Sequence, residues 1–442
     1  MLMKKIGFIS LGCPKNLVDT EIMISILNNK GYVITNDCNE ADVIVINTCG
    51  FIEPAKQESI DTIIEMGLLD KNKKIIVTGC LAQRYGEEIL NEMPEVNAVI
   101  GTGCLEKITE AIEDNPKKLY VDKPYNMDFL INKRNILTNK NYAYLKIAEG
   151  CDNCCSYCVI PSIKGGYKSR NLEDIINETE FLAQKGIKEI ILIAQDTTRY
   201  GTDIYGKRKI TELISEISKI RGIEWIRLLY CYPDEIDDEL IIEISENEKV
   251  CNYIDIPIQH ASNRVLKNMN RRGNRQEIQS LIDKLRSSIK DVKIRTSLIV
   301  GFPGETKEDF YNLCAFVKAN KFDRLGVFIY SKEEGTIAYN LKGHVPATVK
   351  ERRYKTIMEM QKDIIEKKNM NEYGRVYKTI VEGVSDDGIF YYGRTYGEAP
   401  DIDNQVYFTS INPLIIGEFA NIKILNVQEY DLIGEVVNEF AK

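Results

Sequence analysis

Three closely spaced cysteines place the strongest constraint on this chain. Cys151, Cys155 and Cys158 form a C-x3-C-x2-C pattern directly after the strand-like segment 142–147. Thiolates this close on one loop can hold three irons of a four-iron, four-sulfur cluster, which leaves the fourth iron without a protein ligand. A single C-x2-C pair would fit zinc or a redox pair equally well, whereas three cysteines after a strand favour a cluster. Cys154 lies between them and could shift the pattern by one residue.

Length and composition narrow the class of protein. A chain of 442 residues predicts two or three domains, and no apolar run reaches the roughly 18 residues that a membrane span needs. Twelve cysteines without a secretory signal indicate metal or catalytic use in a reducing compartment, so we expect a cytoplasmic protein that does not contact a membrane. Two histidines are too few for a His-rich metal site.

Residues 1–117 predict a small parallel α/β domain. Apolar strand segments alternate there with helical spacing, which is typical of a parallel sheet covered by helices on both faces. The predicted strands are 6–11, 42–47, 74–78 and 98–100, and the predicted helices are 20–29 and 53–67.

A second set of cysteines follows the strands of this first domain. Cys13, Cys49 and Cys80 each come one or two residues after a strand, and the carboxyl ends of parallel strands open on one edge of a sheet. Neighbouring glycines give the backbone room to approach a bulky group, namely Gly12, Gly50 and Gly79. The pattern predicts a second cluster site, with three unrelated buried cysteines as the alternative. Cys104 also follows a strand and is a rival ligand.

A polar linker at 118–136 leads into a larger β-then-α region at 137–367. Six strands separated by amphipathic helices predict a parallel partial (β/α)6 barrel, with a ligand at the carboxyl ends of its strands. The predicted strands are 142–147, 188–193, 225–229, 253–256, 293–300 and 325–329. Polar residues at those ends could bind that ligand or be satisfied by the backbone; they are Gln195, Asp196, Gln259, His260, Thr296 and Ser297. For His260 the pattern favours a structural role.

Residues 370–438 predict a small β-barrel, because four short alternating segments are separated by turn residues. The segments are 376–382, 389–393, 405–409 and 420–427. From residue 370 to residue 442 there are 12 acidic and 5 basic side chains, so this region carries nearly all of the net charge of −8. A field of one sign favours a basic partner, and simple solubility is the alternative explanation.

The whole chain resembles the methylthiotransferase family of the radical S-adenosylmethionine (SAM) superfamily. The resemblance rests on the segments 11–16, 47–49, 78–80 and 151–158, in this order, and the C-terminal barrel is similar to the TRAM domain of that family. In the family, the N-terminal trio holds an auxiliary cluster that carries sulfur. The central trio holds the cluster that cleaves SAM to a 5′-deoxyadenosyl radical.

The resemblance also implies roles for single residues. It implies six metal ligands, which are Cys13, Cys49, Cys80, Cys151, Cys155 and Cys158. No catalytic residue beyond these ligands is expected. Tyr157 is an implied SAM contact, because an aromatic ring at this position packs near the adenine in that superfamily. Gln195, Gln259 and Ser297 are further candidates for SAM contacts, because they are polar residues at the strand ends.

Two branches of the family differ in substrate. One modifies an adenosine of transfer RNA (C2 of N6-isopentenyladenosine), and the other modifies an aspartate of the basic small-subunit ribosomal protein uS12. Segments 15–19, 194–198 and 393–403 resemble the ribosomal-protein branch. The acidic tail agrees, since phosphate contacts would favour a basic barrel, and we therefore expect no direct nucleic-acid specificity. The transfer-RNA branch and a non-catalytic iron–sulfur electron carrier are the alternatives.

The resemblance implies a radical mechanism with two SAM molecules, one as methyl donor and one as radical source. We expect the deoxyadenosyl radical to remove hydrogen from the β-carbon of the target aspartate, an unactivated C–H bond that acid–base catalysis would not break. The carbon radical would then take a methylthio group from the auxiliary cluster, so both open irons should face one cavity. An electron donor such as flavodoxin or ferredoxin is expected.

Overall fold

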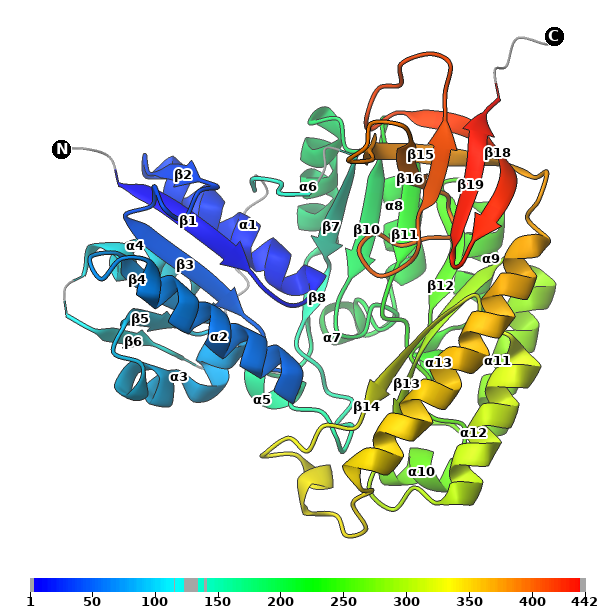
Figure 1. Ribbon diagram of the computed structural model, residues 1–442, viewed down its shortest axis with the longest axis horizontal. Coiled ribbons are helices and arrows are strands. Elements are labelled where there is room, and N and C mark those ends of the chain that lie inside the picture. The colour runs from blue at the N-terminus through cyan, green and yellow to red at the C-terminus, as the bar shows by residue number, and fades with distance from the viewer. Residues whose placement is uncertain (1–3, 115, 123–133, 139–140, 438–442) are drawn as a thin grey trace.

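The chain folds into an N-terminal sheet, a central half-barrel and a C-terminal barrel, coloured blue, green to yellow, and orange to red in Figure 1. This computed structural model describes residues 4–114, 116–122, 134–138 and 141–437. The predicted linker at 118–136 therefore falls largely outside the described residues, as does residue 438 at the end of the predicted barrel.

The N-terminal domain is a six-stranded parallel sheet with the order β2-β1-β3-β4-β5-β6. Its strands are β1 (Lys5–Ser10), β2 (Val33–Thr35), β3 (Val43–Thr48), β4 (Lys74–Gly79), β5 (Val96–Ile100) and β6 (Lys118–Tyr120). The central strand β3 is buried along its whole length, which explains its continuous apolar sequence. The sequence did not reveal β2 and β6, which are short strands at the two edges of the sheet.

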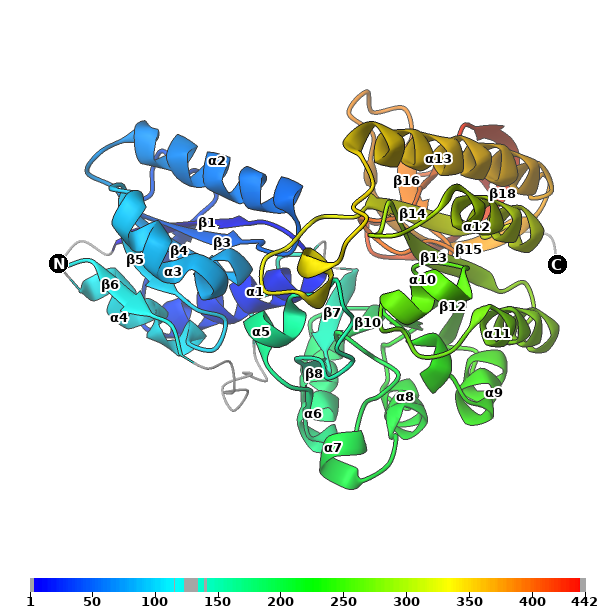
Figure 2. The same ribbon diagram turned by 90° about the horizontal axis from the view of Figure 1, so that it is seen from below.

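Helices cover both faces of this sheet. They are α1 (Pro14–Asn29), α2 (Glu53–Leu69), α3 (Cys80–Glu92), the short η1 (Leu105–Lys107) and α4 (Ile108–Glu113). Apolar residues of α1, η1 and α4 pack on one face, and those of α2 and α3 pack on the other. Figure 2 shows α1 and α2 on opposite sides of the sheet.

The central domain is an open sheet of six parallel strands in the order β7-β10-β11-β12-β13-β14, so the predicted (β/α)6 half-barrel is confirmed. The strands are β7 (Tyr142–Lys146), β10 (Glu189–Ile193), β11 (Trp225–Leu228), β12 (Val250–Asp255), β13 (Lys293–Val300) and β14 (Arg324–Ile329). A two-stranded ladder of β8 (Ala148–Glu149) and β9 (Lys168–Ser169) flanks the cysteine loop.

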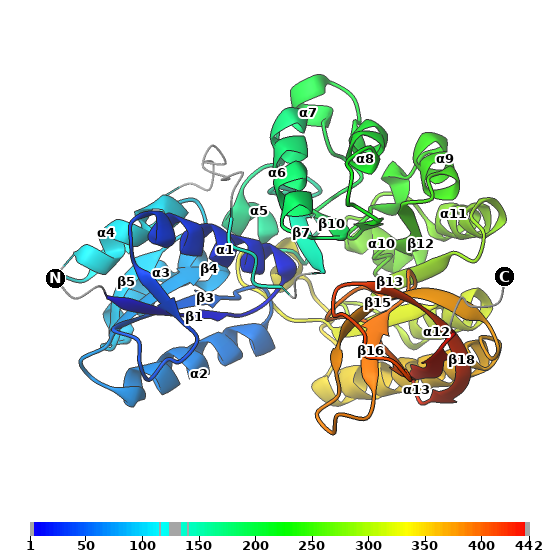
Figure 3. The same ribbon diagram turned by 90° about the horizontal axis from the view of Figure 1, so that it is seen from above.

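The helices of the central domain form an outer arc around the strands, as Figure 3 shows for α6, α8, α9 and α11. In chain order they are α5 (Ile160–Lys164), α6 (Leu172–Gln184), α7 (Thr202–Tyr205), α8 (Ile210–Ser218), η2 (Pro233–Glu235), α9 (Asp238–Glu246), α10 (Asn263–Asn268), α11 (Arg275–Ser288), α12 (Lys307–Asn320), η3 (Ile337–Asn340) and α13 (Ala347–Met370). Their amphipathic faces and the outer side of the sheet form the largest apolar core of the chain.

The inner side of the half-barrel is covered by the other two domains. Val18 and Ile22 of α1 pack there, and so do Ile380 and Ala399 of the C-terminal domain. The C-terminal domain is a closed barrel in the order β15-β16-β17-β19-β18. Its strands are β15 (Val376–Val384), β16 (Tyr391–Arg394), β17 (Val406–Thr409), β18 (Phe419–Gln428) and β19 (Asp431–Val436), of which β19 was not predicted.

Buried ion pairs join the C-terminal barrel to the central sheet. Arg394 of β16 contacts Glu189 at 2.7 Å and Glu382 at 2.8 Å, and Arg227 of β11 also contacts Glu189, at 2.6 Å. Glu189 is the first residue of β10, so these charges enter the half-barrel near the amino end of that strand. At the carboxyl end of β10, Ala194 is contacted by Lys15 of the N-terminal domain.

Candidate functional site

The three N-terminal cysteines follow three neighbouring strands. Cys13 precedes α1 after β1, Cys49 follows β3, and Cys80 begins α3 directly after β4. Because β1, β3 and β4 are adjacent and parallel, their carboxyl ends bring these residues to one edge of the sheet.

Asn16 connects the three loops that carry these cysteines. Its amide nitrogen donates to Leu11 O at 3.1 Å and to Thr48 O at 3.0 Å, and the Cys80 thiol donates to its Oδ1 at 3.7 Å. One side chain in the first turn of α1 therefore fixes the loops after β1, β3 and β4 against one another.

Glycines allow the loops to approach closely. A Cβ at Gly12 would lie 3.3 Å from Cys49 Sγ, and one at Gly79 would lie 2.5 Å from Thr48 O. Gly79 also has φ +94°, a conformation that L side chains rarely adopt. These close approaches explain why glycines lie next to the cysteines at this edge.

The thiols at this edge are close enough to influence one another. Burial raises the pKa of Cys49 and raises that of Cys80 to about 12, and the neighbouring thiols at Cys13 and Cys49 add to the effect on Cys80. Such thiols are poor nucleophiles by themselves and ionise only when a metal replaces the proton. The trio is thus suited to binding iron rather than to acting as free thiolates.

The central cysteines lie on the loop between β8 and α5. The backbone N–H of Asn153 donates to Cys151 Sγ and that of Ile160 to Cys158 Sγ, both at 3.5 Å, while Cys158 N donates to Cys155 O at 3.0 Å. Burial raises the pKa of Cys151 to about 11 and that of Cys158 to about 12. Backbone N–H groups aimed at sulfur are the interactions that stabilise cluster thiolates.

Two residues that sequence reasoning missed contact this loop. The Tyr232 hydroxyl lies 2.8 Å from Cys155 Sγ, and Arg271 stacks on the Tyr232 ring at 3.9 Å and donates to Cys155 Sγ at 3.9 Å. Both come from segments far along the chain, after β11 and α10. Neither lies in a recognisable motif, so no sequence signal marked them.

The rival cysteines lie elsewhere. Cys154 is exposed, with φ 50°, and its backbone oxygen accepts a hydrogen bond from Asn270. Cys104 is buried in the apolar core between the first sheet and α1. Neither placement supports a ligand role. The other four thiols, at Cys38, Cys231, Cys251 and Cys314, also lie outside the two trios and pack with apolar residues.

The predicted SAM contacts lie around the carboxyl ends of the central strands. Tyr157 packs against an apolar cluster that includes Met269 and Phe302. Gln195 donates to Glu149 at 2.5 Å, and its own Oε1 is buried without a partner. Ser297 points to the inner side of β13, and Gln259, with φ 69°, bridges to that strand beside it. Their contact with SAM stays a prediction, but the unpartnered amide oxygen of Gln195 leaves an acceptor for a ligand.

A buried charge cluster lies between the two trios. Asp19 of α1 accepts from Lys146 and, at 3.0 Å, from Lys164, and Glu149 accepts from Lys146 at 2.7 Å. Lys164 also acts electrostatically on Cys80. His260 is fully buried and accepts a hydrogen bond from the backbone of Ser262, which agrees with a structural role.

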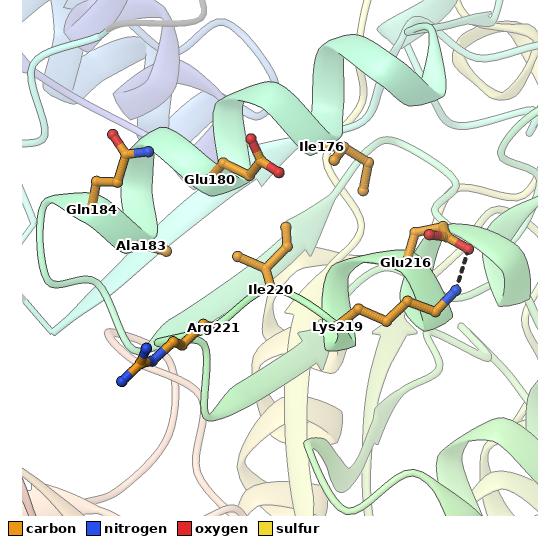
Figure 4. A pocket seen from close by; sticks show the side chains of 8 residues that line it. All are labelled: Ile176, Glu180, Ala183, Gln184, Glu216, Lys219, Ile220 and Arg221. Carbon is orange, nitrogen blue, oxygen red and sulfur yellow. Dashed lines mark hydrogen bonds and ion pairs between the residues drawn. The ribbon is translucent and has the colours of Figure 1, made fainter.

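Two further observations limit the kind of site. Among the described residues, no group of three or more His, Cys, Asp or Glu side chains is arranged to hold a metal ion. The ligands of a four-iron cluster bind different irons and need not share one coordination sphere, so this finding bears on a single ion and leaves the cluster as a prediction. A pocket between α6 and the end of α8 is lined by residues of these two helices and of the turn after α8, and no cysteine is among them (Figure 4).

Comparison with known proteins agrees with this architecture. Residues 5–101 match the family described as Uncharacterized protein family UPF0004, residues 145–317 match the Radical SAM superfamily, and residues 374–437 match the TRAM domain. Three curated relatives share the name "Ribosomal protein uS12 methylthiotransferase RimO". The protein of Acetivibrio thermocellus is 57% identical over 99% of this chain and 100% of its own. Those of Thermoanaerobacter sp. and Clostridioides difficile are 52% and 49% identical, over 98% and 99% of this chain and 100% of their own.

This chain belongs to the RimO family of radical SAM methylthiotransferases. Among solved structures, the radical SAM methyltransferase TsrM from Kitasatospora setae has a TM-score of 0.53 at 15% identity and covers 74% of this chain and 75% of its own. That likeness concerns the fold alone. No helix among the described residues of this RimO-family chain is long and apolar enough to cross a membrane.

Proposed function

We propose that this protein adds a methylthio group to the β-carbon of an aspartate of ribosomal protein uS12. The observation that carries the proposal is the 49–57% identity to RimO proteins over nearly the whole length. The two cysteine trios fit the chemistry, because each leaves one iron of a four-iron cluster free. A cytoplasmic location follows from a ribosomal substrate.

The cofactors in this proposal are two 4Fe–4S clusters and SAM. We assign the auxiliary cluster to domain 1–117 (Cys13, Cys49 and Cys80) and the SAM-cleaving cluster to domain 137–367 (Cys151, Cys155 and Cys158), followed by the barrel at 370–438. When bound, these groups supply a deoxyadenosyl radical and a transferable methylthio group. An electron donor such as flavodoxin or ferredoxin belongs to the same proposal.

The residues of the chain serve this chemistry by holding the thiolates and shielding them. Asn16 keeps the three N-terminal loops in register. Tyr232 and Arg271 direct a hydroxyl and a guanidinium at Cys155, which favours the negative charge that develops on a ligated sulfur. Closely packed apolar residues around Tyr157 and beside Cys80 limit the access of water to both trios.

The acidic C-terminal domain supports a cationic protein partner less strongly than its composition suggests. Glu372, Glu382 and Glu398 are buried in ion pairs with Lys293, Arg394 and Arg324. Their charges are therefore neutralised by these cations and do not face a partner protein. Exposed carboxylates do remain on the barrel, at Asp386, Asp387, Glu429 and Glu435.

An exposed apolar loop on the same barrel favours a protein partner. Ile411, Ile415 and Ile416 lie between β17 and β18, and Ile411 is 93% exposed. Such side chains suit protein contacts, whereas a surface that reads RNA needs basic and stacking groups. We keep the expectation that the protein lacks direct nucleic-acid specificity as part of this proposal.

The test is an assay with two substrates. Anaerobically reconstituted enzyme, with SAM and a chemical reductant, is incubated separately with purified uS12 and with transfer RNA, and the products are measured by mass spectrometry. We expect uS12 to gain the mass of one methylthio group in place of hydrogen, located on a single aspartate. A gain on transfer RNA alone would establish the other branch, and absence of SAM cleavage would favour an electron carrier.

A further inference from the structure

A buried lysine lacks an anionic partner in the described part of the chain. Lys15 stands in the first turn of α1 and is 8% exposed. Its Nζ lies 3.5 Å from Ala194 O and 3.4 Å from the centre of the Tyr230 ring, and no carboxylate of the described residues forms an ion pair with it. A carbonyl and an aromatic face only partly replace the water that a cation loses on burial.

Among the described residues, no ion pair neutralises Lys15. Lys146 and Lys164 already pair with Asp19 and Glu149, and Glu149 acts on Lys15 electrostatically without forming an ion pair with it. Three lysines thus face two carboxylates, which leaves one positive charge in excess. Buried charges are normally paired, so a ligand is expected to supply the missing anion.

The end of α1 adds to the positive field. This 16-residue helix has no acidic residue in its first turn, and Cys13 makes no side-chain capping bond. The partial positive charge of the helix N-terminus therefore acts in the same place as the ammonium group of Lys15.

Lys15 is placed between the two trios. It is two residues from Cys13, yet its side chain reaches over the carboxyl ends of β10 and β11, where Ala194 and Tyr230 lie. The Tyr230 backbone is in the left-handed region, with φ 62°, and is held there by a hydrogen bond of 3.0 Å to Asp255. A strained backbone fixed in this way indicates that the position of the ring matters.

We propose that Lys15 binds the side-chain carboxylate of the target aspartate, an inference that rests on the proposed function. The carboxylate carbon is bonded directly to the β-carbon that is modified. The carboxylate oxygens that a cation contacts are two bonds from this carbon, so a fixed cation restricts where the reacting carbon can lie. Lys15 would thus determine specificity for aspartate, as a binding and positioning residue.

Two other anions could occupy this position, and the test separates them. The SAM carboxylate is one of them, because Glu149, two residues before Cys151, acts electrostatically on Lys15 as Cys13 does. Binding of Lys15 to SAM would change the affinity for both forms of uS12 equally. The auxiliary cluster with its thiolates is the nearer competitor, and a role toward it would alter iron content or the cluster spectrum.

The experiment is a double-mutant cycle on binding. Anaerobic, cluster-loaded wild type and Lys15→Met are titrated with uS12 and with a uS12 variant whose modified aspartate is replaced by asparagine. We expect Lys15→Met to weaken binding of native uS12 by roughly tenfold or more and to leave binding of the asparagine form nearly unchanged. Lys15→Arg should restore part of the preference for aspartate. Lys185→Met, which removes an exposed lysine over the Phe181 ring, is the matched control.

Each outcome decides the question. The inference is overturned if Lys15→Met weakens binding of both forms of uS12 equally. It is also overturned if Lys15→Met changes the iron content or the cluster spectrum but produces no difference in affinity between the two forms. If Lys15→Met does not fold, equal affinity of wild type for the two forms overturns it as well. Failure of wild type to modify uS12 at all is a separate result, because it rejects the proposed function itself.

Discussion

The buried Arg394 offers a quantitative test of how the C-terminal barrel is held. Its side chain is 1% exposed and contacts Glu189 at 2.7 Å, Glu382 at 2.8 Å and the backbone oxygen of Glu398 at 3.1 Å. Arg394→Met keeps much of the volume but leaves two buried carboxylates with less compensation. Removing one partner of a buried ion pair costs about 3–5 kcal/mol. With a urea m value of about 3 kcal/mol/M, the unfolding midpoint should fall by about 1–2 M.

The chain carries its own reporter for this event. Trp225, the single tryptophan, packs edge-on against Phe419 of β18, with ring centres 4.7 Å apart. Its fluorescence in urea therefore follows separation of the barrel from the sheet. Arg375→Met is the control, because Arg375 is 47% exposed and its ion pairs, at 3.4 and 3.7 Å, are worth at most about 1 kcal/mol.

The pH dependence gives an independent check. Burial opposes ionisation of Glu189, but Arg394 and Arg227 outweigh it and hold the pKa of Glu189 below its ordinary value. In wild type this carboxylate stabilises the fold above its unfolded-state pKa, and the contribution is lost as pH falls through the folded-state pKa. Without Arg394, the Glu189 carboxylate protonates more readily. The difference in free energy of unfolding between wild type and Arg394→Met should therefore be smaller at pH 5.5 than at pH 7.5. If the urea midpoint of Arg394→Met is no lower than that of Arg375→Met, the reasoning is refuted.

Three further predictions concern the candidate site. Changing Cys13, Cys49 and Cys80 together to Ala should roughly halve the bound iron, abolish methylthiolation and leave SAM cleavage to deoxyadenosine; retained product would disprove the assignment of the N-terminal trio. Tyr232→Phe removes the hydroxyl that contacts Cys155, so the reduction potential of the central cluster should fall in a spectroscopic titration; an unchanged potential would speak against that contact. Gly79→Ala should lower the melting temperature and the iron content more than Gly186→Ala, because both glycines have positive φ but only the former meets Asn47 and Thr48; equal losses would mean that the crowding around Gly79 is not felt.

The sequence predicted those parts of the fold that depend on local patterns. The strands β3 and β13 were placed nearly to the residue, and the alternation of strands with helices predicted that the sheets are parallel. The edge strands β2 and β6 have three residues each, which is too short for a periodicity to mark them. The final strand β19 was missed because its segment continues the pattern of β18 with only a short turn between them.

The chemistry of the interior was harder to foresee. Cysteine spacing led to the two trios, but Tyr232 and Arg271 approach Cys155 only through tertiary structure. The net charge of the C-terminal region was a weak guide to its binding partner, because it counts every carboxylate as if it were exposed. Glu382 and Glu398 lie instead in buried ion pairs with arginines.

Helix α1 has a consequence for engineering this enzyme. Cys13 precedes it, Asn16 joins three loops of its own domain, and Asp19 and Val18 contact the central domain. A chimera that exchanges the N-terminal domain for that of a distant relative would therefore import a foreign surface into the half-barrel. Such a graft should work only when α1 is retained from the recipient or when its buried face is matched to the new neighbour.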